Sequence, residues 1–213
     1  MNFLDPKLDD YVVKHTENES PILNELNRKT WLEILNPRMI AGHFQGRVLS
    51  MLSHMIQPKN ILEIGTFTGY SALCWAEGLA QNGTIHTIDI NEELEDLAST
   101  YVKKSGLENN VKFHIGNALD IIPKLDFEWD IVFLDADKSN YTNYYDLVFE
   151  RVKKGGYIIA DNVLWNGKVI DKSTWNEIDT KAILEFNKAV QNDQRVQNVL
   201  FPIRDGLMIA RKL

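Results

Sequence analysis

The stretch Leu62-Glu63-Ile64-Gly65-Thr66-Phe67-Thr68-Gly69-Tyr70-Ser71 decides the fold. Its apolar beginning is typical of a buried strand, and the residues that follow Gly69 are suited to a helix. Gly65 and Gly69 let the backbone turn sharply between the two elements and come close to a ligand. We therefore predict a strand that turns directly into a helix, the first unit of an α/β fold.

The same alternation continues through the rest of the chain. Repeated strand–helix units predict a mostly parallel sheet with right-handed crossovers. The turn at Asp205-Gly206 predicts that the chain closes with an antiparallel pair of strands at one edge. The predicted strands are 61–65, 84–89, 111–115, 130–135, 157–161, 196–201 and 207–211, and the predicted helices are 70–80, 92–105, 119–125, 141–152 and 177–190.

The first 58 residues carry a different pattern, in which prolines stand at expected helix starts. Pro6, Pro21 and Pro37 each precede apolar residues at helical spacing, and proline is favoured at the first position of a helix. We predict one domain over residues 1–213, with 1–58 as a helical cover and 59–213 as the α/β core.

Composition and charge restrict the classes of function. The formal net charge is -7 and no run of basic residues is longer than two, so we expect no nucleic-acid partner. No apolar stretch has the length of a membrane span, and the N-terminal segment lacks the apolar region of a signal peptide. The single cysteine, Cys74, follows an apolar periodicity, which indicates a buried thiol in a cytoplasmic protein.

Acidic residues next to the glycine turn indicate which nucleotide is bound. Asp89 ends the second predicted strand, where a carboxylate can hold both hydroxyls of a ribose. Glu63 precedes Gly65 and would repel a pyrophosphate, but it can receive an amino group. Together with Ser71, this combination favours a nucleoside that bears an amino acid, S-adenosylmethionine. A plain glycine turn with an acidic strand end is the alternative interpretation.

Two apolar runs end in oxygen-bearing side chains. They are Phe133-Leu134-Asp135-Ala136-Asp137-Lys138 and Ile158-Ile159-Ala160-Asp161-Asn162. Because ligands lie beyond the carboxyl ends of parallel strands, we expect these side chains to converge. Two carboxylates and an amide oxygen suit a hard divalent cation such as magnesium. Alternatively, each aspartate only caps the helix that follows it.

These strings resemble the cation-dependent O-methyltransferases, which include catechol and caffeoyl-CoA O-methyltransferases. Residues 62–71 resemble the first motif of that family, residues 133–144 its metal and catalytic loop, 161–169 its second metal loop, and 205–207 its closing turn. The resemblance implies a Rossmann-like class I methyltransferase fold with a seven-stranded, mostly parallel sheet, an antiparallel edge strand and helices on both faces. It also implies a homodimer that methylates a hydroxyl of a catechol-type small molecule.

The family's roles carry over to the matching positions. The implied metal ligands are Asp135, Asp161 and Asn162, with Mg²⁺ expected first and Mn²⁺ or Ca²⁺ as alternatives, and Lys138 is the implied general base. The implied cofactor contacts are Met39, Ala41, Glu63, Gly65, Ser71, Asp89, Asn117, Ala118, Asp135 and Asp137, and the candidate substrate contacts are Lys138, Trp165 and His43.

The sequence leaves other interpretations open. Lys138 can instead pair with Asp135 or Asp137, Trp165 can serve packing, and His43 can be structural. Val199 and Pro37 replace substrate-side residues of the mammalian catechol enzyme, which leaves the acceptor undefined. The rival functions are a nicotinamide-dependent oxidoreductase, which Glu63 disfavours, and a non-catalytic module that binds metal or nucleoside.

Overall fold

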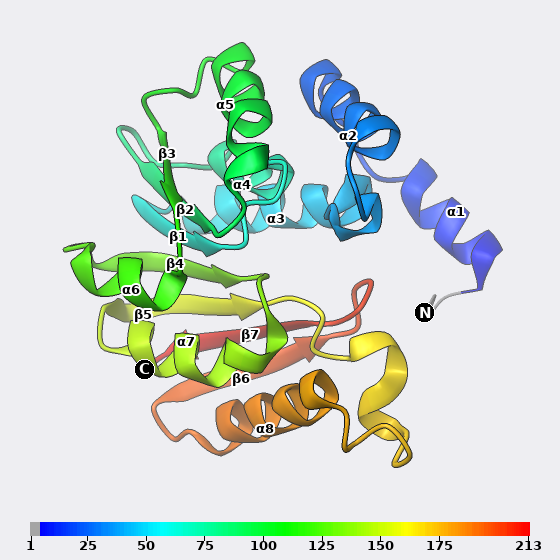
Figure 1. Cartoon of the computed structure of the whole chain (residues 1–213), viewed down its shortest axis with the longest axis vertical. Helices are drawn as coiled ribbons and strands as arrows, with labels where there is room; N and C mark the ends of the chain where they lie inside the picture. Colours follow the sequence, from blue (N-terminus) through cyan, green and yellow to red (C-terminus); the bar gives the residue numbers. More distant parts are fainter. Residues whose placement is uncertain (1–4) are drawn as a thin grey trace. The chain divides into compact units, whose positions relative to one another are not determined.

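The computed structural model describes residues 5–213 (Figure 1). Residues 1–4 lie outside the described residues, so the predictions of a helical cover and of an N-terminal segment that is not a signal peptide fall partly outside them. The described residues group into two compact units, 5–117 and 118–213. Seven strands in the described chain form a mixed, mostly parallel sheet, as predicted. The first unit contributes the run β3-β2-β1 and the second the run β4-β5-β7-β6.

Three parallel strands organise the first unit. They are β1 (Asn60–Ile64), β2 (Thr84–Asp89) and β3 (Val111–Ile115), and β2 pairs with both neighbours. Residues of β1 are almost all buried, as expected for a strand covered on both faces. The helices α4 (Tyr70–Ala76) and α5 (Glu95–Lys104) follow β1 and β2. Both are shorter than predicted, because α4 ends after Ala76 and residues 92–94 form a separate 3-10 turn, η2 (Glu92–Leu94).

Proline and polar caps set the N-terminal helices of this unit. Asp5 caps α1 (Pro6–Lys14) and Ser20 caps α2 (Pro21–Glu33), each accepting a backbone N–H of the first turn. Pro37 begins only the 3-10 turn η1 (Pro37–Met39), and the next helix, α3 (Gly42–Ile56), starts later than predicted. Helix α3 packs on α4, and α2 packs on α4 and α5.

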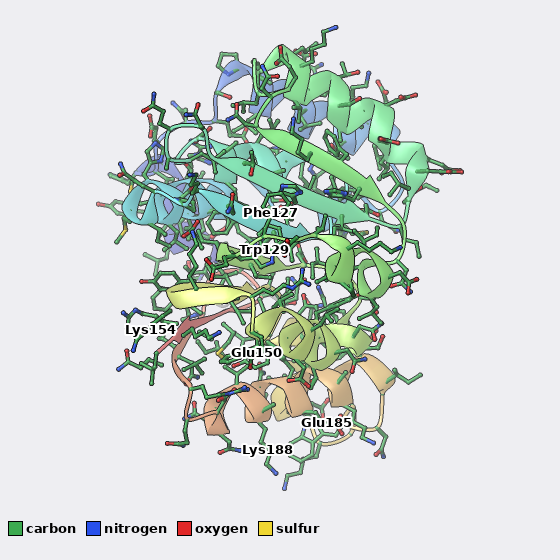
Figure 2. The ribbon with its side chains drawn as sticks, turned by 90° about the vertical axis from the view of Figure 1, so that its left-hand side faces the viewer. Phe127, Trp129, Glu150, Lys154, Glu185 and Lys188 are labelled. Carbon is green, nitrogen blue, oxygen red and sulfur yellow. The ribbon has the colours of Figure 1, made fainter. Side chains whose placement is uncertain are left out.

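The second unit holds the strands β4 (Trp129–Leu134), β5 (Val152–Ala160), β6 (Val196–Phe201) and β7 (Leu207–Lys212). Strand β5 begins five residues earlier than the predicted start at 157. Trp129 is fully buried, and its ring centroid lies 5.4 Å from that of Phe127 (Figure 2). The helical segments are α6 (Ala118–Ile121), η3 (Ile122–Lys124), η4 (Lys138–Asn140), α7 (Tyr141–Phe149), η5 (Trp165–Ile170) and α8 (Ile178–Asn192).

The antiparallel strand of the sheet is β7, which lies between β5 and β6 (Figure 1). We predicted an antiparallel pair at the edge, and the edge strand itself is β6. A tight turn makes β6 and β7 antiparallel neighbours, with Gly206 N–H donating to the carbonyl of Ile203 at 2.8 Å. Insertion of β7 beside β5 then leaves β6 outermost.

Several large aromatic and apolar side chains are exposed. Trp31 and Trp175, of a residue type that usually packs internally, have exposed fractions of 54% and 39%. Leu32, Leu35 and Met55, which follow the helical periodicity of the N-terminal block, are also exposed. Helices α2 and α3 contact α4 through other residues, and Leu35 lies beyond the end of α2, so helical spacing alone overstated the buried face. Cys74 is fully buried, as predicted.

None of the helices in the described part of the chain combines the length and apolar character needed to cross a membrane.

Candidate active site

Two neighbouring strand ends in the second unit bring the predicted metal ligands together. Strands β4 and β5 pair in parallel with Leu134 opposite Ala160, so Asp135 and Asp161 leave the sheet side by side. The backbone N–H of Asp161 donates to the carbonyl of Leu134 at 3.0 Å and fixes this register. The predicted convergence of the two runs is therefore present in the fold.

The residue after Asp161 adopts a left-handed conformation. Asn162 has φ 59°, a region in which asparagine is tolerated better than most residues. Its N–H donates to Oδ1 of the Asp161 carboxylate at 2.7 Å. Asn162 thus turns sharply at the strand end and stays beside Asp161.

Lys138 is buried, with only 9% of its side chain exposed. Its Nζ lies 3.2 Å from Oδ1 of Asp135 and 2.7 Å from the hydroxyl of Tyr141. The ion pair with Asp135 that we weighed as an alternative exists, whereas Asp137 is bonded to Tyr144, Ser139 and Asn140. The lysine charge is therefore held inside the site rather than on the surface.

Burial and neighbouring charges act on the carboxylates of this cluster in opposite directions. Burial raises the pKa of Asp135, Lys138 opposes that rise, and the charge of Asp161 adds to it. Burial, followed by the charges of Asp135 and Asp161, also holds the pKa of Tyr141 well above its usual value. The positive charge of Arg204 also lowers the pKa of Asp135, so two carboxylates at the strand ends are opposed by Lys138 and Arg204. Together with the Asn162 amide, this donor set fits a divalent cation.

A cluster of charged ligands alone would not have revealed this site. Among residues 5–213, no group of three or more His, Cys, Asp or Glu side chains is arranged to hold a metal ion. The predicted site has only two carboxylates, and its third expected protein ligand is the amide oxygen of Asn162.

The loop that follows Asn162 is bound to the β6–β7 turn. Leu164 N–H donates to the carbonyl of Asp205 at 2.8 Å, and Asn166 N–H donates to the Asp205 carboxylate at 2.6 Å. Gly206 is essential to this contact, since a Cβ there would lie 2.6 Å from Cγ of Leu164. Trp165 and Asn166 both have positive φ, so the loop holds strained residues in place.

The first unit carries the predicted nucleoside residues around the β1–α4 turn. Glu63 is fully buried and accepts a hydrogen bond of 2.6 Å from the hydroxyl of Thr87. Gly65 and Gly69 have φ values of 108° and 81°, which explains why glycine is needed at both. A Cβ at Gly69 would also lie 3.2 Å from Cβ of Ala98.

Asp89 stands at the end of β2 with its carboxylate already oriented. One oxygen accepts the N–H of Phe67 at 2.7 Å and the other accepts the N–H of Asn91 at 2.9 Å. Each carboxylate oxygen has a second lone pair, so hydroxyl groups can still donate to both. The turn and the strand end thus hold this acid in a fixed position.

The remaining predicted residues have varied environments. In the first unit, Ala41 and Ser71 are buried, Met39 is 60% exposed and Asn117 is exposed. In the second unit, Ala118 is buried and Asp137 is exposed. Nε2 of His43 donates a 2.6 Å hydrogen bond to the carbonyl of Glu17, which supports the structural interpretation of this residue.

Two residues with clear roles in the second unit were missed as site residues. The Tyr141 hydroxyl contacts Lys138, and Asp205 holds the 164–166 loop. The spacing of Lys138 and Tyr141, three positions apart at a helix start, was a usable signal, because such residues share a helix face. No local pattern could have indicated Asp205, whose partner lies 39 positions away.

Comparison with known proteins identifies the family. A sequence profile described as O-methyltransferase matches residues 13–213. The chain belongs to the O-methyltransferase family. This confirms the predicted family and the predicted enzyme class, an S-adenosylmethionine-dependent O-methyltransferase, and removes the oxidoreductase alternative.

Individual relatives agree with this assignment. The chain is 37% identical over 186 residues to caffeoyl-CoA O-methyltransferase 2 of Populus trichocarpa, covering 82% of this chain and 75% of the relative. Among solved structures, it resembles the Bacillus cereus O-methyltransferase in complex with SAH, with a TM-score of 0.89, 28% identity and 97% coverage of each chain. It also resembles TomG of Streptomyces achromogenes in complex with SAM, with a TM-score of 0.87, 26% identity, and coverage of 97% and 96%.

Proposed function

We propose that this O-methyltransferase moves the methyl group of S-adenosylmethionine to a hydroxyl of a catechol-type small molecule in the presence of a divalent cation. The products are a methyl ether and S-adenosylhomocysteine. The observation that carries the proposal is the buried cluster of Asp135, Asp161 and Lys138 at two adjacent strand ends. Such a cluster joins hard oxygen ligands to a group that can accept a proton.

Asp135, Asp161 and Asn162 are the proposed cation ligands, with Mg²⁺ as the first choice. A bound divalent cation supplies positive charge, which stabilises the oxygen of an acceptor that has lost its proton and orients a vicinal diol. The protein contributes the two carboxylates at fixed spacing and the Asn162 amide beside them. Asp161 is buried and Asp135 is only partly exposed, so their charges act more strongly on an acceptor than they would in bulk water.

Lys138 is the proposed general base. As a free amine, its Nζ takes the proton of the acceptor hydroxyl, whose oxygen then forms a bond to the methyl carbon while the carbon–sulfur bond breaks. The lysine carries the proton as an ammonium group, and Asp135 at 3.2 Å stabilises that charge. Positioned proton transfer of this kind contributes about 10²–10⁴-fold in rate.

Residues of the first unit are proposed to hold most of the cofactor. Asp89 is suited to the ribose hydroxyls, and Glu63 to the amino group of the methionine part. Gly65, Ser71, Met39, Ala41 and Asn117 are the other proposed contacts in this unit. Ala118, Asp135 and Asp137 are the proposed contacts in the second unit, and Trp165 is a proposed acceptor contact.

The proposed setting is a cytoplasmic homodimer that acts on a small aromatic molecule. The single buried thiol, Cys74, agrees with a reducing compartment. Exposed apolar side chains on α2 and α3, including Leu32, Met51 and Met55, offer a surface for a second copy. The relatives named caffeoyl-CoA O-methyltransferase support an aromatic acceptor with two neighbouring hydroxyls.

The test is methyl transfer from labelled S-adenosylmethionine to a panel of catechols, with Mg²⁺ and with chelator. We expect turnover that chelator abolishes, and Lys138→Ala should reduce it about 10²-fold or more. A matched control, Lys153→Ala, removes a lysine that is also paired to an aspartate, Asp130 at 2.7 Å, and should be active. Turnover that is equal with and without chelator would refute the metal. Tight binding of S-adenosylmethionine without turnover of any catechol would refute the proposed acceptor class and direct the search to other acceptors.

A further inference from the structure

The hydroxyl of Tyr141 lies at the centre of the buried cluster. The side chain is fully buried at the start of α7. Its oxygen is 2.7 Å from Nζ of Lys138, 3.1 Å from the carbonyl of Leu134 and 3.0 Å from the carbonyl of Asp161. One oxygen atom therefore contacts the lysine and the ends of both β4 and β5.

The direction of these hydrogen bonds follows from the chemistry of the partners. In this geometry the Tyr141 hydroxyl donates its single proton to the carbonyl of Leu134 or of Asp161, and Nζ of Lys138 donates to the phenol oxygen. An ammonium group has no lone pair, so it can only donate to the phenol oxygen. A free amine that keeps the same hydrogen bond also directs one N–H at Tyr141.

This arrangement constrains where the lone pair of the free amine points. A free amine has two N–H bonds and one lone pair, and one N–H is taken by Tyr141. The lone pair must therefore point away from the phenol. The ring adds a second restraint, since Nζ lies 4.8 Å from its centroid.

We propose that Tyr141 is a positioning residue for the proton transfer, fixing Nζ of Lys138 relative to the strand ends that carry Asp135, Asp161 and Asn162. This inference rests on the proposed function, in which Lys138 is the general base. A hydroxyl that merely satisfied two buried carbonyls would support the fold and would not act through Lys138.

The first experiment is Tyr141→Phe, which removes the hydroxyl and keeps the ring. We expect kcat for a catechol acceptor to fall about tenfold or more, because a misplaced base loses proximity and orientation. KM for the acceptor and the Kd of S-adenosylhomocysteine should stay within about twofold, since binding groups are untouched. The matched control is Tyr145→Phe on the same helix, whose buried hydroxyl donates to Asp193 at 3.0 Å. This control should keep the kcat of the wild type.

A double-mutant cycle separates positioning from general support of the fold. If Tyr141 acts through Lys138, adding Tyr141→Phe to Lys138→Ala should cost less than about twofold in kcat. If Tyr141→Phe reduced kcat tenfold both in the wild type and in Lys138→Ala, the role of Tyr141 would be purely structural and the inference would be overturned.

A measurement on the protein without metal or cofactor gives an independent answer. Acetylation by acetic anhydride, mapped by peptide mass spectrometry, reports how freely each lysine reacts. We expect Lys138 to be acetylated about fivefold or more faster in Tyr141→Phe, because its Nζ loses a partner and gains freedom. Lys153 serves as the internal reference. An unchanged rate at Lys138 would contradict the inference.

If Tyr141→Phe does not fold, the wild-type hydroxyl proton can be followed by NMR. Buried between two carbonyls, it should exchange far more slowly than that of Tyr11, which is 59% exposed, and its resonance should move in Lys138→Ala. Fast exchange or an unmoved resonance would overturn the inference. Full activity of Lys138→Ala would instead refute the base role itself, whereas an inactive Lys138→Ala beside a fully active Tyr141→Phe would refute only the role of Tyr141.

Discussion

At the scale of single residues, the site depends on buried charges whose partners are fixed by the backbone. An isolated ammonium or carboxylate group would be costly to bury, and the cost is offset only by partners in good geometry. Lys138 has Asp135 and the Tyr141 hydroxyl, and Asp161 has the N–H of Asn162. Asn162 has a left-handed conformation, and its backbone N–H lies next to the Asp161 carboxylate, which gives that buried charge a partner.

Removal of one cation ligand should separate metal use from cofactor binding. We expect Asp161→Ala to reduce Mg²⁺-dependent turnover about 10³-fold, since a hard cation loses a carboxylate ligand. The Kd of S-adenosylhomocysteine, measured by calorimetry, should change less than about threefold. Asp146→Ala, which alters an exposed aspartate of α7, is the control. Equal loss of turnover and of cofactor binding would argue against separate roles for these residues.

Asp89 provides the complementary test for the cofactor. Asp89→Asn keeps the size of the side chain but removes the charge that suits two ribose hydroxyls. We expect the Kd of S-adenosylhomocysteine to rise about 10–100-fold, the value of a hydrogen bond to a charged group. Calorimetry with the apo protein measures this, and Asp96→Asn in the first turn of α5 is the control. An unchanged Kd would remove Asp89 from the cofactor site.

At the scale of elements, close helix contacts and strand pairs set the environment of the β1–α4 turn. Helix α3 approaches α4 so closely that Gly46 has no room for a side chain. A Cβ there would lie 2.7 Å from Cε1 of Tyr70 and 2.8 Å from Sγ of Cys74. On the other side of the unit, β2 and β3 bring His86 and His114 together, with Nδ1 and Nε2 3.0 Å apart.

Gly46→Ala tests the contact between α3 and α4. In an exposed helix this change stabilises by about 1 kcal/mol, because alanine is the better helix former. Here overpacking against Tyr70 and Cys74 should cost about 1–3 kcal/mol and outweigh that gain. We expect the free energy of unfolding in urea to fall by up to about 2 kcal/mol, which is the overpacking cost less the helix gain. A rise in stability would show that the helices can separate without cost.

The histidine pair predicts how stability depends on pH. Burial, followed by His114 and Lys112, lowers the pKa of His86 to about 4, and burial also lowers the pKa of His114. In the unfolded chain, the histidine pKa is about 6.5. Between pH about 4 and pH about 6.5, the unfolded state binds more protons than the folded state. The contribution of His86 to the free energy of unfolding is therefore complete above pH about 6.5 and is lost as the pH falls toward about 4.

When the free energy of unfolding is measured from pH 7 to pH 4.5, it should therefore fall less for His86→Gln than for the wild type. The difference should reach up to about 3 kcal/mol in the free energy of unfolding, less if water enters the site. His15→Gln, which alters an exposed histidine, should follow the wild-type profile. Parallel profiles for the wild type and His86→Gln would contradict the assignment.

At the scale of the whole molecule, exposed apolar side chains indicate self-association. Trp31, Leu32, Met51 and Met55 lie on α2 and α3 with exposed fractions of 54% to 74%. We expect a homodimer in light scattering coupled to gel filtration, and Met55→Lys should shift it toward monomer, because a charge would be buried in the interface. Val199→Lys changes an exposed apolar residue of β6 and should stay dimeric. A monomeric wild type would refute the homodimer.

The sequence by itself determined the order of strands and helices, the glycine turn and which polar residues stand at the ends of β4 and β5. These features depend on local rules, namely the apolar periodicity, proline and polar caps at helix starts, and glycine where φ is positive. Strands 84–89, 111–115 and 196–201 agree with the structure at both ends. Helix ends, such as that of α4, were wrong because apolar residues continue past the point where the helical hydrogen bonds stop.

Only the tertiary structure decided which distant groups meet. Nothing local places β7 between β5 and β6, binds Asp205 to the loop after Asn162, or leaves Trp31 in solvent. The hydroxyl of Tyr141 is the clearest case, because its meaning depends on carbonyls 7 and 20 positions away. Contacts of this kind are set by strand pairing and burial across the whole unit, and a pattern read along the chain does not contain them.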